Sequence, residues 1–134
     1  MTIRQLATHI AELPGWVSMA IATDGLDFAE NPYNPEVLNN SAELLENLEM
    51  NVTNARASLE QTNEEILDQP WTLRNGDTII MTSSKAEVIR VALNQTTHHR
   101  AQLGVYLRLL NIAIPGSYGP SADELEYAGT EQEA

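Results

Sequence analysis

The chain has 134 residues, 43% of them hydrophobic and 19% charged, which is typical of one folded domain rather than a disordered segment. Its 19 acidic and 7 basic residues give a formal net charge of −12. Because nucleic acids and anionic membranes are bound by clustered Lys and Arg, both are excluded as expected partners. The chain has no cysteine, which excludes disulfides, thiolate metal ligands and a cysteine nucleophile.

Targeting signals are also missing from the sequence pattern. No stretch reaches the roughly 20 apolar residues of a membrane span. The opening "MTIRQLATHIAELPGW" lacks the basic start and the long apolar run of a signal peptide. We therefore expect a soluble, cytoplasmic protein.

The pattern of apolar and polar residues in 1–23 predicts a helix. Thr2 and Gln5 have the spacing of a capping box. Pro14 removes a backbone hydrogen bond and Gly15 loosens the chain, which predicts a kink or a break there. His9 lies at the edge of the predicted apolar face, whose members recur at steps of three and four residues: Leu6, Ile10, Leu13, Val17 and Ile21.

Residues 24–37 predict a loop, because prolines, a glycine and asparagines gather there. A second helix is predicted to begin near Asn40, with Glu43 in capping-box position, and to end near Thr62 or to continue briefly through "NEEILDQ". Its predicted inner face is Leu45, Leu48, Val52, Ala55 and Leu59, and its opposite face carries Glu46, Asn47 and Asn54.

The segment 71–81 predicts a β-hairpin, with the arms "WTLR" and "DTIIM" and a turn at Asn75–Gly76. The longest helix, of about 25 residues, follows from Ser84, which Glu87 completes as a capping box. Its periodic inner face is predicted to be Val88, Ala92, Gln95, His99, Gln102 or Leu103, Tyr106 and Leu110. These elements predict an all-α fold, an up-and-down helical bundle over residues 1–124 with a small hairpin insertion, and a disordered acidic tail over 125–134.

Two polar residues stand on the inner face of this last helix. Gln95 and His99 are four residues apart and therefore share one face. Two ligands at this spacing can bind one divalent metal ion, and His9 from the first helix can supply a third donor. The alternative is that the inward histidines are hydrogen-bonded to backbone carbonyls or neighbours. His98 points about 100° away from His99, which makes it a flanking residue.

Other candidate pocket residues surround this set. Glu12 lies three residues after His9 and can accept a hydrogen bond from its ring, although a solvated surface position is the simpler interpretation. Trp16 is predicted to line the core or the pocket. Arg100 is predicted to pair with surface acids or to lie beside the site. No GxSxG, HExxH or glycine-rich phosphate loop occurs, so the residues that would carry catalysis are not identified by a motif.

The stretches "LATHIAELPGW" and "HHRAQLGVYLRLLNIAIPGSYGPSADE" resemble the DinB/YfiT-like superfamily over nearly the whole chain. The resemblance implies a four-helix bundle, often dimeric, with a three-histidine site for a divalent ion such as zinc or nickel. Its ligand positions correspond to His9, Gln95 and His99. Some relatives transfer groups to low-molecular-weight thiols such as bacillithiol or mycothiol.

Two departures from this pattern matter. The middle ligand is Gln95, a weaker donor than histidine, so the metal can be lost. Relatives also carry a helix before "LATHIAEL", so we expect this bundle to lack its first helix, through truncation or through a dimer partner that takes its place. The sequence therefore leaves two functions open: a metal-dependent thiol S-transferase or hydrolase acting on a small molecule, or a non-catalytic helical module for interaction or small-molecule binding that has lost its metal.

Overall fold

A computed structural model describes residues 1–125, so nearly all of the predicted acidic tail lies outside the described part. The predicted first helix is divided at Pro14 into α1 (Ile3–Glu12) and α2 (Gly15–Ala22), as the sequence indicates. The capping box is present. The Gln5 amide donates to Thr2 Oγ1 at 3.2 Å, and the Thr2 amide donates to Gln5 Oε1 at 2.8 Å.

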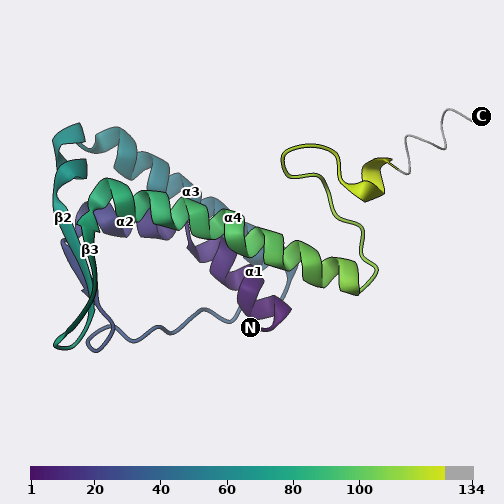
Figure 1. Cartoon of the computed structure of the whole chain (residues 1–134), viewed down its shortest axis with the longest axis horizontal. Helices are drawn as coiled ribbons and strands as arrows, with labels where there is room; N and C mark the ends of the chain where they lie inside the picture. The colour runs from purple at the N-terminus through teal and green to yellow at the C-terminus, as the bar shows by residue number, and fades with distance from the viewer. Residues whose placement is uncertain (126–134) are drawn as a thin grey trace, which may run out of the picture.

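The two long helices begin where their caps predict. In α3 (Ser41–Gln61) the Asn40 side chain accepts from the Glu43 amide, and in α4 (Lys85–Leu109) the Ser84 hydroxyl accepts from the Glu87 amide. A short 3-10 helix, η1 (Glu64–Asp68), follows α3. Both α3 and α4 pack against α1 and α2, so the broken first helix lies between them (Figure 1).

The prediction of an all-α fold is wrong. Within the described residues, β1 (Gly25–Asp27), β2 (Pro70–Asn75) and β3 (Thr78–Ser84) form a mixed sheet at one end of the helices (Figure 1). Strand β1 is parallel to β2 and comes from the segment predicted to be a loop. A Cβ on Gly25 would lie 2.3 Å from the Thr72 carbonyl oxygen, so only glycine permits this approach. A strand of this length has no detectable periodicity, which is why the sequence does not reveal it.

The predicted hairpin is confirmed, with its turn displaced by one residue. Asn75 pairs with Thr78 as the last rung of the β2–β3 ladder, so the central turn residues are Gly76 and Asp77. Gly76 has φ +56°, the left-handed conformation that glycine adopts without strain. Asp27 holds this turn against β1, because its carboxylate accepts from the Gly76 amide at 2.8 Å.

The fold is centred on a core at the sheet end. Ala20 of α2, Trp71 of β2 and Val88 of α4 are buried against one another. The Trp71 indole N–H donates to Thr23 Oγ1 at 3.0 Å. Lys85 is also buried there, and its ammonium donates to the Ile21 carbonyl at 3.2 Å.

The predicted inner face of α3 is largely wrong. Ala55 is buried as expected, but Leu45 is 58% exposed, and the predicted outward residue Asn47 is 7% exposed. Polar contacts orient the helix: Asn51 donates to the Ala11 carbonyl at 3.1 Å, and Ser58 bonds Ser18 at 3.1 Å. Because these hydrogen bonds face α1 and α2, the apolar stripe is turned outward.

The predicted inner face of α4 holds only in part, and this part includes the half-buried His99. Val88 and Ala92 are buried, whereas Gln95 and Leu110 are exposed. Figure 1 shows that α4 runs on past α1, so its C-terminal half has less of the molecule to pack against. A regular apolar period therefore does not mean burial along the whole helix.

Candidate functional site

The site is built where α1 and α4 cross. The rings of His9 and His99 meet there with their centroids 4.8 Å apart and their planes at 74°. Both side chains are half-buried. Residues 90 positions apart in the chain are thus brought to one point by helix packing, as the inner-face pattern of the sequence predicts for this pair.

The orientation of His99 is fixed by its own helix. Its Nδ1 lies 2.9 Å from Gln102 Oε1. An amide oxygen can only accept, so this contact favours the tautomer of the neutral ring with the proton on Nδ1 and the lone pair on Nε2. His98 is exposed, and its ring centroid lies 4.9 Å from that of His99. The Gln102 bond therefore selects the ring nitrogen that is available to a ligand.

His9 is held in its neutral form. Burial lowers the pKa of His9 below its usual value, and the nearby His99 lowers it further, while the Glu12 carboxylate opposes the shift. Neutral imidazole is the form that binds a metal or accepts a proton. The lowered pKa of His9 therefore favours the form whose ring offers a lone pair.

Tyr33 lies beside His9 on the solvent side of the pair, and no sequence pattern selects it. Its ring meets the His9 ring edge-on at 6.2 Å, and its hydroxyl donates to Glu12 Oε2 at 2.8 Å. Burial, followed by the bond to Glu12, raises the pKa of Tyr33 to about 12. Tyr33 belongs to the irregular segment after β1, where no periodicity indicates which side chains face inward. The prolines and asparagines around Tyr33 predict a loop, but they do not indicate which of its side chains contacts the histidines.

The third predicted ligand is more exposed than the two histidines. Gln95 is exposed on α4, one helical turn before His99. Over residues 1–125, no cluster of three or more His, Cys, Asp or Glu side chains is arranged to hold a metal ion. A metal at this position would therefore need amide or solvent oxygens beside the two imidazoles.

One cavity reaches the histidine pair, and a second reaches Tyr33 beside it. One of about 430 Å³ opens beside His99, and one of about 440 Å³ opens beside Tyr33. Small-molecule sites commonly have volumes in this range. The cavity beside His99 is lined by Met1, Leu6, His99, Gln102, Val105 and Tyr106.

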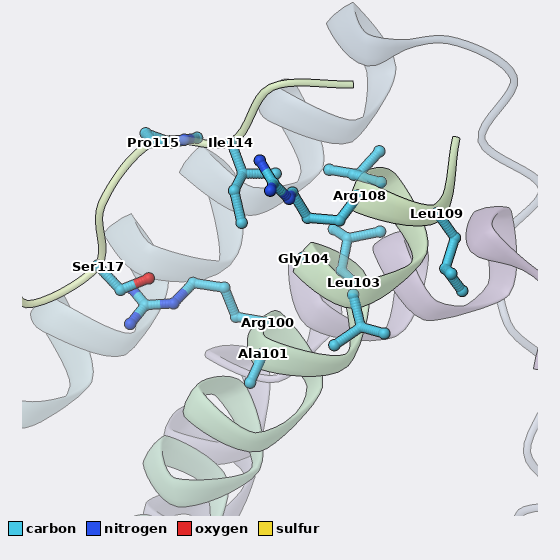
Figure 2. A pocket seen from close by; sticks show the side chains of 11 residues that line it. Arg100, Ala101, Leu103, Gly104, Arg108, Leu109, Ile114, Pro115 and Ser117 are labelled. Atoms are coloured by element: carbon cyan, nitrogen blue, oxygen red, sulfur yellow. The ribbon is translucent and has the colours of Figure 1, made fainter. Parts of the chain in front are cut away.

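The remaining predicted pocket residues are placed elsewhere. Trp16 packs against the sheet-end core, with its ring 6.3 Å from that of Trp71. Arg100 stacks over the Tyr118 ring at 5.3 Å. Figure 2 shows Arg100 beside a separate cavity of about 550 Å³ between α4 and the segment around Ile114. Neither residue is shown in contact with the two histidines.

Comparison with known families matches residues 1–133 to the DinB family. The chain belongs to the DinB family. No curated protein and no solved structure matches it. The resemblance seen in "LATHIAELPGW" and "HHRAQL" is thus confirmed for this DinB protein, and its histidine pair lies in those two stretches. No helix among the described residues is both long enough and apolar enough to cross a bilayer.

Proposed function

We propose that this DinB protein binds a divalent metal ion, zinc or nickel, through His9 and His99. The observation that carries the proposal is the convergence of two imidazoles from separate helices, with centroids 4.8 Å apart. Rings in this arrangement can turn their free nitrogens toward one ion at bonds of about 2.0–2.1 Å.

The side chains at the site suit a metal ion, but they supply an incomplete set of ligands. The lowered pKa of His9 favours its neutral, metal-binding form. His99 is oriented by Gln102, as metal-binding histidines are oriented by a hydrogen bond to the other ring nitrogen. Gln95 stands one turn before His99 and can offer its amide oxygen after a change of rotamer. Two imidazoles and an amide leave coordination positions for water or substrate, which is the arrangement of a catalytic rather than a structural site.

The activity that fits this site is a metal-dependent transfer to a low-molecular-weight thiol or a hydrolysis. A bound metal would lower the pKa of a thiol or of water and so supply a nucleophile at neutral pH. The chain's own groups bind and orient. The Glu12 carboxylate accepts a hydrogen bond from the Tyr33 hydroxyl at 2.8 Å, which positions this carboxylate near His9. The cavity beside His99 is large enough for a small-molecule substrate.

The test is a calorimetric titration of the metal-stripped protein with Zn²⁺ and Ni²⁺, supported by elemental analysis. We expect one ion per chain, lost in His9→Ala and in His99→Ala. His98→Ala is the matched control, because its ring is exposed beside the pair, and it should bind as the parent does. Wild-type protein that binds neither ion, or binding that falls equally in the control, would contradict the proposal.

Gln95→His measures the contribution of the third position. A histidine one turn before His99 adds a better donor for zinc, so affinity should rise by about tenfold, equivalent to about 1.4 kcal/mol. The stoichiometry should remain one ion per chain. An unchanged affinity would remove residue 95 from the ligand set while leaving His9 and His99 in it.

A second candidate function is a non-catalytic helical module that binds a small molecule or a protein without metal. Gln95 favours it, because the third ligand position is occupied by an exposed amide. Under this alternative the wild-type protein takes up no ion, and Gln95→His creates a site that was absent before. The same titrations therefore separate the two functions.

A further inference from the structure

The cavity at the C-terminal end of α4 is a second candidate site, distinct from the histidine pair. It has a volume of about 550 Å³ and opens between α4 and the segment 114–117 (Figure 2). Arg100, Gly104 and Arg108 line it from α4 and follow one another at intervals of four, so they share one face of the helix. Its lining among the described residues runs from Arg100 to Ser117 and does not include His99.

Gly104 lies between the two arginines and keeps this cavity open. Glycine is among the least favourable residues inside a helix, because it loses the most conformational freedom there. Its position within α4 is helical, and a Cβ would meet Ile114 Cδ1 at 3.6 Å, an ordinary contact distance. Neither the backbone conformation nor a close approach therefore demands glycine. Its effect is to leave the space between α4 and Ile114 empty, at a cost to the stability of the helix.

The wall opposite Gly104 is held by polar contacts. The Asp123 carboxylate pairs with Arg108 and accepts from the Ile114 amide at 3.0 Å. The Ser121 hydroxyl donates to the Ile114 carbonyl at 2.7 Å. Both backbone groups of Ile114 are thus bonded, which fixes this residue across the cavity from α4. Arg108 is used in holding the wall.

Arg100 is the cation that remains for a ligand. Within residues 1–125, no carboxylate forms an ion pair with it. Its guanidinium lies over the Tyr118 ring, 5.3 Å from the centroid, and a contact with the ring face leaves the N–H fork able to bind an anion. Much of the remaining lining is apolar, including Leu103, Leu107 and Pro115. The cavity therefore offers one positive charge beside apolar walls.

We propose that this cavity binds a small molecule with an apolar body and a single carboxylate. The carboxylate pairs with the Arg100 fork, whose geometry matches two carboxylate oxygens, and the body lies along Leu103 and Gly104. A volume of about 550 Å³ is in the range of small-molecule sites.

The charge of the protein favours a monoanion over a phosphate group. The chain carries a formal net charge of −12, and Asp123 already holds Arg108. A second negative charge on the ligand would add repulsion without a second free cation among the lining residues. The inference goes beyond the proposed metal site, because the two sites have no residue in common.

The test is a titration of the metal-free full chain with octanoate, followed by the amide signals in ¹H–¹⁵N NMR spectra. We expect saturable shifts at Gly104 and Ser117. The uncharged 1-octanol should bind at least about fivefold more weakly, because it lacks the charge that pairs with Arg100. Shifts that do not saturate, or that gather at Leu6 and Tyr106 in the cavity beside His99, would overturn the proposal.

Two substitutions separate the charge from the space. Arg100→Gln should weaken octanoate binding by at least about fivefold and leave 1-octanol binding unchanged. Arg90→Gln is the matched control: Arg90 is an exposed arginine of the same helix, paired with Glu87 outside the cavity, and its loss should change neither affinity. Equal weakening in both variants would show that the arginines act only through the net charge, which would refute a carboxylate site at Arg100.

Gly104→Leu tests the cavity itself. Leucine favours the helix more than glycine does, so the variant should fold, which circular dichroism checks. Its side chain would enter the space in front of Ile114 and should abolish the binding of both octanoate and 1-octanol. Octanoate binding that survives this change would place the ligand elsewhere and contradict the proposal.

Discussion

The two ends of the helical layer differ in how their polar groups are held. At the sheet end, Trp71 and Ala20 are fully buried, and the buried Lys85 is bonded to a backbone carbonyl. At the other end, His9 and His99 are only half-buried, and cavities open beside His99 and Tyr33. The same helices α1/α2 and α4 run through both regions (Figure 1).

This difference separates stability from function. A packed core contributes to the free energy of unfolding through apolar burial and satisfied hydrogen bonds. A site that must admit a ligand needs groups left accessible and lone pairs left free, and these add little to stability. Substitutions at the two ends should therefore have different consequences, and the predictions below test that contrast.

The largest effect is expected at Trp71. Trp71→Ala removes a fully buried side chain and should lower the free energy of unfolding by about 3–5 kcal/mol. His99→Ala should cost less than about 1 kcal/mol, because that ring is half-buried in an open region. Urea denaturation followed by circular dichroism measures both. If Trp71→Ala does not fold, Trp71→Phe should still cost about 1–3 kcal/mol. Equal costs at the two ends would contradict the contrast.

A smaller effect is expected at Lys85. Its ammonium lies 3.3 Å from the Asp24 carboxylate, but the Lys85 side chain is 3% exposed and that of Asp24 is 91% exposed. Lys85→Met leaves the Ile21 carbonyl without this donor and should cost about 1–3 kcal/mol. Asp24→Asn should cost less than about 1 kcal/mol, because water screens the exposed carboxylate and Lys85 keeps its bond to the Ile21 carbonyl. Thermal unfolding of both variants decides whether the backbone bond or the ion pair matters.

The sequence predicts local structure well where a short pattern determines it. Thr2, Asn40 and Ser84 cap helices because each side chain reaches an amide of the next turn, which depends on nearby residues alone. The division at Pro14 and the hairpin before α4 follow from equally local chemistry. The encounter of His9 and His99 required only that two helix faces be inward and adjacent.

Long-range structure was harder to predict. Strand β1 exists because Gly25 allows the chain to approach β2, and that partner lies far away in sequence. The inner face of α3 was misassigned because Asn51 and Ser58 bond to α1 and α2, which outweighs the apolar period. Tyr33 reaches His9 from an irregular segment, where residue spacing carries no information about direction.

A modest effect is expected at the hairpin turn of the sheet end. Gly76 has φ +56°, and a residue with a Cβ pays about 1–2 kcal/mol in that conformation. Gly76→Ala should therefore lower stability by roughly that amount. Gly119→Ala is the control, because a Cβ there meets no atom within 4 Å, and it should leave stability within about 1 kcal/mol or raise it. Chemical denaturation that ranks the two variants the other way would show that the turn is not held in the left-handed conformation.

The smallest effect is expected at the histidine end and concerns pH. Burial and His99 lower the pKa of His9 from 6.5, so the unfolded chain binds a proton there more readily than the folded chain. The stability that this group contributes is complete above about pH 6.5 and is lost as pH falls through the lower, folded-state pKa.

The free energy of unfolding of the metal-free protein should therefore decline gently between about pH 7.5 and pH 5. The carboxylates with a lowered pKa, Asp27, Asp123 and Glu124, are protonated below this window and do not mask the decline. His9→Gln should flatten the slope, and His98→Gln should leave it in place. If stability depends on pH equally in His9→Gln, the histidine pair is more open to solvent than its half-buried geometry indicates. The two ends of the helical layer would then differ even more in burial.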